Sequence, residues 1–145
     1  MRDELYQILT APRDTDREIR DLTEQIYTLM WITVPGAIRY DTPRVQTSPE
    51  DKMAFMSAEV DELQRKLVEL CKRRRREEGT IKELMRRCID LDSKERQVLR
   101  LRYLYRESWD KVARDLAFTE RWAYTIHKSA TCKLEAFLGL QGNKM

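Results

Sequence analysis

Apolar residues recur at alternating spacings of three and four through the middle of the chain, the period of a helix that buries one stripe. The stripe consists of Met53, Met56, Val60, Leu63, Leu67, Leu70, Ile81, Leu84, Cys88 and Leu91, with polar Arg74 and Glu77 in the same register. Ser48 followed by Pro49 favours a helix start, because serine caps helices and proline suits the first helical position. We therefore predict a long helix over about 49–91 whose seam is typical of a coiled coil.

Gly79 is the one feature that opposes an unbroken helix there. Glycine is a poor helix former, and Thr80 with Glu83 has the spacing of a capping box that could start a new helix. A hairpin would have no reason to keep the register on both sides of the break. The pattern favours continuity, with a break at Gly79 as the alternative.

The N-terminal part carries a second stripe at helical spacing, formed by Ile19, Leu22, Ile26 and Leu29. Thr15 and Glu18 form a capping box, so we predict a short first helix that ends before Pro12 and a second helix over about 14–33. Residues 34–48 contain two prolines and a glycine without helical period, which indicates a connector. The two stripes are expected to pack as an antiparallel pair, with self-association of a coiled-coil stalk over residues 1–91 as the alternative.

Three further helices are predicted after residue 91. The first begins at Asp92 or Ser93 and continues to about Tyr105. The second covers Trp109 to Leu116 with Ser108 as its cap, and the third covers Glu120 to about Leu138 with Thr119 as its cap. The chain is thus expected to be all-α, with a helical stalk (1–91) and a C-terminal domain (92–140).

The last two predicted helices have the spacings of a helix-turn-helix. Ala113 is small enough for the helices to cross closely, and Leu116, Phe118 and Ile126 are placed to hold the turn and the last helix. Ala117 occupies a turn position at which glycine is common, because the backbone there often has a positive φ. An apolar helix hairpin also occurs without any DNA-binding role, and this purely structural alternative stays open.

A recognition helix needs an outer side that is free to enter the major groove of DNA. Arginine and lysine donate to guanine or phosphate, glutamate accepts from cytosine, and capped helix N-termini can face backbone phosphates. The candidate DNA-binding residues are Ser108, Thr119, Glu120, Arg121, Tyr124, Thr125 and Lys128. Trp122 is expected to be a packing anchor, and the lone His127 a hydrogen-bonding residue between helices.

Charge and composition narrow the remaining classes. Residues 93–145 hold 11 Lys and Arg against 6 Asp and Glu, a net charge of +5 that favours a polyanionic partner. The basic run Lys72–Arg76 is expected to be a solvated helix face with Glu77 and Glu78 as partners, or alternatively a phosphate-contacting patch. With three cysteines at no metal-ligand spacing and no leader or long apolar run, we expect a cytoplasmic protein without cofactor, metal or membrane partner. No catalytic motif is found, so no enzyme activity is expected.

The segment from Leu91 to Leu134 resembles region four of bacterial sigma factors, through LDSKERQVLRLRY followed by SWDKVARDLAFTE. The stretch RYLYRESWDKVARDLAFTERWAYTIHKSA is similar to small phage and prophage proteins of Gram-positive bacteria in the RinA and ArpU late-gene regulator group, and VQTSPEDKM resembles a signature of an uncharacterised family in that group. The resemblance covers about residues 41–138. It implies a regulator of phage transcription that binds double-stranded DNA at promoters and that has RNA polymerase as a further partner.

Two other functions remain open from the sequence. A small-terminase-type component of phage DNA packaging also joins a helix-turn-helix to an oligomerising stalk, and assembly into large rings would distinguish it. An adaptor that binds RNA polymerase without DNA contact is the third possibility. The DNA target and the choice between activation and repression are beyond what the sequence establishes.

Overall fold

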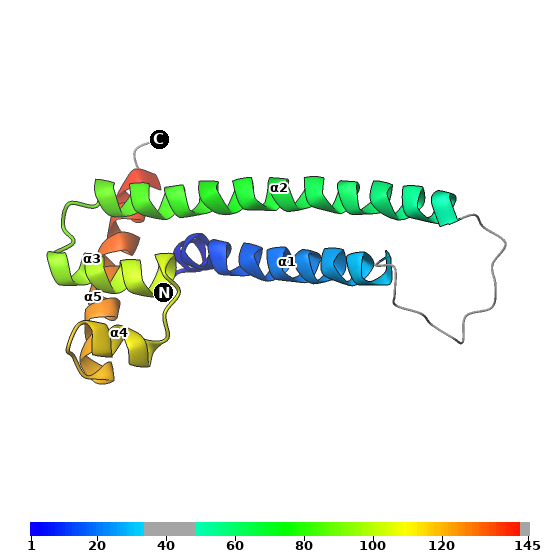
Figure 1. Ribbon diagram of the computed structural model, residues 1–145. Coiled ribbons are helices and arrows are strands. Elements are labelled where there is room, and N and C mark those ends of the chain that lie inside the picture. Colours follow the sequence, from blue (N-terminus) through cyan, green and yellow to red (C-terminus); the bar gives the residue numbers. More distant parts are fainter. Residues whose placement is uncertain (34–48, 143–145) are drawn as a thin grey trace. The chain divides into compact units, whose positions relative to one another are not determined.

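The computed structural model describes residues 1–33 and 49–142, with side chains over 1–31 and 56–140. These residues form an all-helical structure without strands, which confirms the predicted all-α class. The elements are α1 (Asp3–Thr33), α2 (Pro49–Arg87), α3 (Ser93–Leu99), the π-helical turn η1 (Arg100–Leu104), α4 (Trp109–Asp115) and α5 (Glu120–Gly142) (Figure 1). The predicted connector over 34–48, with the Ser48 cap, lies outside the described residues.

The chain divides into two compact units, and the division falls inside α1 and inside α2. Unit 1 comprises residues 1–14 and 74–145, and unit 2 comprises residues 15–73. All the candidate DNA-binding residues belong to unit 1. The first residues of the chain therefore share a core with the C-terminal helices, a pairing that no local pattern predicts.

Pro12 does not end a helix, contrary to the prediction from sequence. α1 begins at Asp3 and continues through Pro12, so the expected helix start near residue 14 is wrong. A proline inside a helix removes one hydrogen bond and crowds the preceding turn. Burial of the proline and of apolar residues in the turns before it (Leu5 and Leu9) offsets this cost. Thr15 does not cap a helix, because its hydroxyl accepts hydrogen bonds from Arg73 at 3.3 Å.

Helix α2 is unbroken at Gly79, as the preserved register predicts. An added Cβ at Gly79 would meet nothing within 4 Å, so this glycine lies on an open helix face and not at a turn. The helix ends at Arg87, four residues earlier than predicted. Ile81, Leu84, Cys88 and Leu91 are nevertheless all buried, as expected of the seam.

The side chain of Arg96 fixes the end of α2 against the start of α3. The last carbonyl groups of a helix have no partner within it, and they need donors from elsewhere. The Arg96 guanidinium donates to the Met85 carbonyl oxygen in the last turn of α2 at 2.6 Å. It also donates to the carbonyl oxygens of Cys88 at 2.9 Å and Leu91 at 3.2 Å, between α2 and α3. The Asp92 carboxylate accepts from the Glu95 backbone N–H at 2.8 Å and so caps α3.

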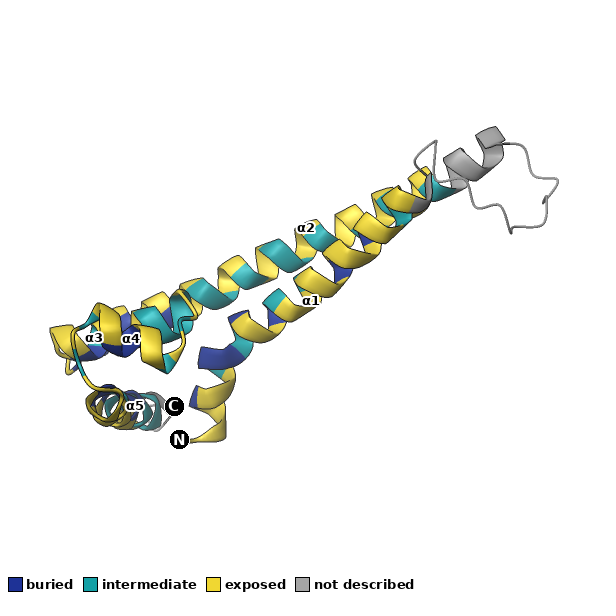
Figure 2. Ribbon diagram, turned by 60° about the horizontal axis from the view of Figure 1, so that its bottom comes forward, coloured by how far each residue is buried: buried dark blue, intermediate teal, exposed yellow. Residues whose placement is uncertain are grey.

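Unit 1 has two apolar clusters. The first joins the beginning of α1, the end of α2, α3 and the later part of α5, and it contains Leu5, Leu9, Ile81, Leu84, Met85, Cys88, Leu91, Leu99, Ala130 and Leu134. The second joins α3, α4 and the beginning of α5, and it contains Val98, Val112, Ala113, Ala123 and Ile126. Figure 2 shows these buried positions in dark blue, against exposed positions in yellow. The two clusters hold opposite ends of α5.

In unit 2, the residues of both predicted stripes lie on the less exposed sides of their helices. Leu22 and Ile26 of α1 are buried, and Leu63 and Leu67 of α2 are half-buried. The segments of α1 and α2 in this unit run side by side in both views (Figures 1 and 2). An ion pair of 2.5 Å joins Arg73 to Glu18 across them.

Over residues 1–33 and 49–142, no helix combines the length and apolar character needed to cross a lipid bilayer. Cys71, Cys88 and Cys132 are free thiols. Burial raises the pKa of the Cys88 thiol, so Cys88 is a neutral core residue at neutral pH.

We predict that Arg96→Lys lowers the free energy of unfolding by about 1–3 kcal/mol, because a lysine ammonium cannot bond three divergent carbonyls and leaves some of them unpaired. Urea denaturation followed by circular dichroism measures the change. The control is Arg100→Lys on the neighbouring, exposed position, which should change stability by less than about 0.5 kcal/mol. Equal effects of the two substitutions would contradict the capping role.

Candidate nucleic-acid interface

The helices α4 and α5 begin at the caps that the sequence predicts. The Ser108 hydroxyl accepts from the Lys111 backbone N–H at 3.3 Å, and the Thr119 hydroxyl accepts from the Trp122 backbone N–H at 3.1 Å. Each cap satisfies a backbone donor that the first helical turn leaves without a partner. Both caps are solvent-exposed, as a contact with phosphate requires.

The turn between α4 and α5 is tight and has a left-handed residue. Ala117 has a φ of 56°, as expected at a position where glycine is common. The Phe118 backbone N–H then donates to the Ala113 carbonyl oxygen at 2.8 Å and returns the chain toward α5. Because an alanine Cβ is crowded in this conformation, the turn carries local strain.

One side of α5 is seated in the second apolar cluster. Ala123 and Ile126 are buried beside Ala113 of α4, and the half-buried Leu116 and Phe118 pack on the same cluster. These are the small residue and the holding residues that the sequence pattern identifies, so their predicted packing is confirmed.

The opposite side of α5 is open to solvent over its first two and a half turns. Glu120, Arg121, Tyr124, Thr125 and Lys128 are all exposed and, at 3.6 residues per turn, share one face. Among the described residues neither Arg121 nor Lys128 forms an ion pair, so their charges are available to a partner. The Thr125 hydroxyl donates to the Arg121 carbonyl oxygen at 3.0 Å. The structure thus brings these five candidate residues together on one accessible surface of α5.

Trp122 is not a packing anchor, contrary to the prediction from sequence. Its side chain is 50% exposed, because helical geometry places it just beyond the edge of the buried stripe that Ala123 and Ile126 form. Apolar character alone does not assign a residue to the buried side of a helix. Trp122 instead adds an exposed aromatic ring to the open part of α5.

Aromatic contacts fix the position of Tyr124. Its ring lies 4.6 Å from the ring of Trp109 on α4, and the Trp109 ring lies 4.8 Å from that of His127. The guanidinium of Arg102 lies 4.8 Å over the centre of the Trp109 ring, a cation–π contact. The ring of Tyr124 is therefore held in place by Trp109 although Tyr124 is exposed at the surface.

His127 connects two elements, as the sequence predicts. Its Nε2 atom lies 2.5 Å from the hydroxyl of Tyr103 on η1. Burial, and next the charge of Arg102, lower the pKa of His127 to about 4. Burial also raises the pKa of Tyr103, so at neutral pH the hydrogen bond joins an uncharged tyrosine to an uncharged imidazole.

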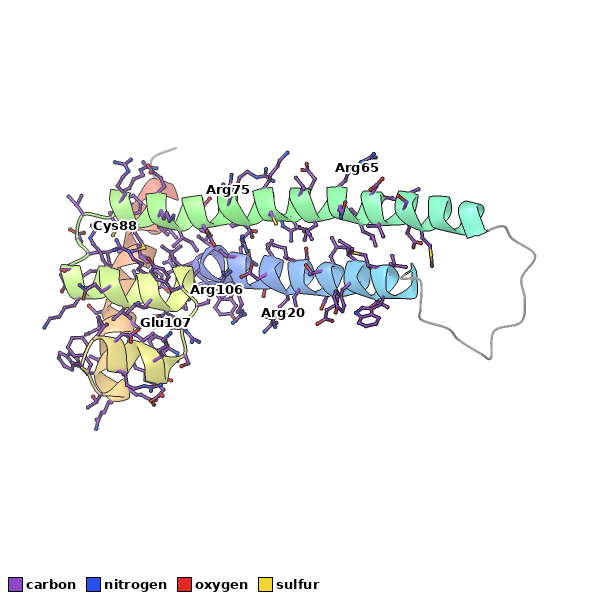
Figure 3. All side chains as sticks on the ribbon, in the orientation of Figure 1. Arg20, Arg65, Arg75, Cys88, Arg106 and Glu107 are labelled. Carbon is purple, nitrogen blue, oxygen red and sulfur yellow. The ribbon has the colours of Figure 1, made fainter. Side chains whose placement is uncertain are left out.

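Two residues of the basic run pair with carboxylates other than Glu77 and Glu78. Lys72 pairs with Glu69 at 3.4 Å, and Arg73 pairs with Glu18, both within unit 2. Arg75 is exposed (Figure 3). These contacts are compatible both with a solvated helix face and with a phosphate-contacting patch.

Sequence reasoning overlooked a group of basic residues close to Tyr124. Arg102 and Arg106 are four residues apart in the segment before α4, a spacing visible in the sequence. Arg13 joins them from α1, and only the tertiary structure shows this. Figure 3 labels Arg106 in the loop that joins η1 to α4. No cluster of His, Cys, Asp and Glu with the geometry of a metal site occurs in the part of the chain that the structure describes.

Comparisons of the chain with protein-family models, with curated proteins and with solved structures found no match.

We predict that Ala117→Gly raises the free energy of unfolding by about 0.5–1 kcal/mol, because glycine adopts a φ of 56° without the crowding of a Cβ. Thermal or urea denaturation measures this change in the free energy of unfolding. The matched control is Ala136→Gly at an exposed position inside α5, where glycine should destabilise by a similar amount. Destabilisation by both substitutions would show that the turn is not strained.

The pKa of His127 predicts a pH dependence of stability. The folded pKa of about 4 is below the unfolded value of 6.5, so the unfolded chain binds more protons between these values. Stability is therefore fully present above about pH 6.5 and falls toward pH 4, by about 1–2 kcal/mol after allowance for the partial exposure of the ring.

Urea titrations at several pH values measure this loss. Carboxyl groups also titrate in the range, so the comparison is with His127→Gln, which should show a smaller loss of stability between pH 6.5 and pH 4. Superimposable profiles of the two proteins would exclude a buried neutral His127.

Proposed function

We propose that this protein is a sequence-specific DNA-binding regulator of phage or prophage transcription. In this proposal a coiled-coil stalk precedes a sigma-region-four-like helix-turn-helix, and the N-terminal half of α5 enters the major groove. The observation that carries it is the two-sided character of α5. Ala123 and Ile126 are buried on one side, while Arg121, Tyr124 and Lys128 are exposed together on the other.

The exposed face has the chemistry that base recognition needs. Arg121 can donate two parallel hydrogen bonds to guanine, and Glu120 can accept from the amino group of cytosine. Tyr124 can pack against a sugar or a thymine methyl group with little loss of entropy, since the Trp109 ring already holds it. Lys128, two turns into the helix, is placed for a phosphate at the edge of the groove.

Backbone contacts come from the surroundings of α5. The exposed Thr119 hydroxyl and the N-terminal end of α5 favour a phosphate oxygen. The net charge of +5 over residues 93–145 adds a general attraction to the duplex. Binding should consequently weaken steeply as salt concentration rises.

The assignment to transcription comes from the resemblance of the segment from Leu91 to Leu134 to sigma region four. That region contacts promoter DNA and polymerase together, so RNA polymerase is the proposed protein partner. The exposed Trp122 lies beside the proposed DNA face and offers an aromatic contact to either macromolecule.

The test begins with selection of bound sequences from a random pool of duplex DNA by the full chain. Fluorescence anisotropy then measures affinity for the selected duplex and for a scrambled duplex. We expect a preference for the selected duplex and a linear fall of log affinity with log salt. Arg121→Ala should cost about 1–3 kcal/mol on the selected duplex and reduce the preference between the two.

The matched control is Arg20→Ala, which removes the same charge from an exposed position in unit 2. This variant should retain the sequence preference of the unaltered protein. If no duplex is enriched and the intact protein shows no binding at micromolar concentration, the proposal is wrong. Equal losses of affinity for Arg121→Ala and Arg20→Ala would show that the protein binds DNA by non-specific electrostatic attraction.

A further inference from the structure

In unit 2, helix α1 has a second patterned face, opposite the stripe that it buries. The residues of this outer face recur at alternating spacings of four and three, and all of them are exposed: Arg17, Arg20, Glu24, Tyr27 and Trp31. At 3.6 residues per turn, the outer face lies about half a turn around the helix from the buried Leu22 and Ile26. Figure 3 labels Arg20 on the side of α1 that faces away from α2.

One end of the outer face is aromatic. Tyr27 is 61% exposed and Trp31 is 57% exposed, although both side chains are large and mostly apolar. Their rings are 6.3 Å apart in an edge-to-face arrangement, so they form one surface. Single exposed apolar residues are common on proteins, whereas adjoining tyrosine and tryptophan rings are typical of protein interfaces.

The other end of the outer face is charged. Among the residues that the structure describes, Arg17, Arg20 and Glu24 form no ion pair. Opposite charges in unit 2 do pair where they meet, because Glu18 of α1 binds Arg73 of α2 at 2.5 Å. The three charges of the outer face are therefore available to another molecule.

The order of residues along the outer face is complementary to itself. Suppose that two copies of α1 lie antiparallel about a two-fold axis at the level of Leu22. Each Arg20 then lies opposite Glu24 of the second copy, so opposite charges meet. Each Arg17 lies opposite Tyr27 of the second copy, where a guanidinium and an aromatic ring attract each other. Symmetry makes each of these contacts twice.

A parallel pair of helices lacks this complementarity. In a parallel pair each position faces itself, so Arg17, Arg20 and Glu24 would each meet a like charge. Like charges at these positions destabilise a helix pair, as they do in coiled coils. The charge pattern therefore selects the antiparallel orientation.

We propose that the outer face of α1 binds a second copy of this chain, with the two helices antiparallel about an axis at the level of Leu22. The inference goes beyond the proposed function and does not rest on it, since no residue of α5 takes part. From Arg17 to Trp31 the outer face is about 21 Å long at 1.5 Å per residue, which is short for a coiled coil. The dimer is accordingly weak, and it depends on protein concentration.

Sedimentation equilibrium of the full chain without DNA tests the association. We expect a monomer–dimer equilibrium with a dissociation constant of about 1–100 µM. Tyr27→Ala should weaken the dimer about tenfold, because it removes the ring that faces Arg17 of the second copy.

Charge exchange tests the orientation. Arg20→Glu places two carboxylates opposite each other in both symmetric contacts and should weaken the dimer at least about tenfold. Addition of Glu24→Arg to Arg20→Glu restores opposite charges, so this double variant should associate within about threefold of the unaltered protein. In a parallel dimer Arg20→Glu would only replace one pair of like charges by another. Circular dichroism confirms that each variant is folded.

The matched control is Arg65→Glu, which makes the same charge change at an exposed position of α2 (Figure 3). It should associate as the unaltered protein does. Arg20→Ala removes an attraction without adding a repulsion, so it should weaken the dimer by less than about fivefold and leave the base-reading face of α5 unchanged.

The proposal is wrong if the chain stays monomeric up to about 500 µM, or if it forms assemblies larger than a dimer. It is also wrong if Arg20→Glu and Arg65→Glu have equal effects, or if the folded double variant does not recover association. Failure of the DNA proposal is separable, because Arg121→Ala should abolish sequence preference on duplex DNA and still dimerise as the unaltered protein does.

Discussion

The arrangement of unit 1 depends on how α2 ends. Its apolar seam continues past Arg87, and a longer helix would satisfy the same pattern. The chain turns instead because the guanidinium of Arg96 binds three carbonyl oxygens around residues 85–91, while Asp92 caps α3. One of these bonds satisfies an open carbonyl group in the last turn of α2, and the other two satisfy carbonyl groups between α2 and α3. With α3 fixed, Val98 and Leu99 are buried in separate clusters, and each cluster seats a different part of α5.

Features that depend on a few neighbouring residues could be predicted from the sequence. The caps at Ser108 and Thr119, the left-handed turn at Ala117 and the unbroken helix at Gly79 all follow from local preferences, and the structure has each of them. Features that depend on residues far away in the sequence could not be predicted from it. Pro12 is a strong local stop signal, but burial of α1 against the C-terminal helices outweighs it.

The same distinction applies to the candidate site. The exposed face of α5 could be predicted, because helical period assigns Arg121, Tyr124 and Lys128 to the side opposite the apolar residues. The exposure of Trp122 could not, since its apolar character conflicts with its position at the edge of the stripe. Nor could the position of Arg13 beside Arg102 and Arg106, because these residues lie about ninety positions apart in the sequence.

Tyr124 joins the exposed face of α5 to the packed rings behind that face. Its ring packs on the ring of Trp109, and the guanidinium of Arg102 lies over the same Trp109 ring. Packed rings have few alternative positions, so a change in the position of Trp109 also acts on Tyr124. A partner that contacts Tyr124 therefore meets a side chain whose position depends on residues of η1 and α4 and not on α5 alone.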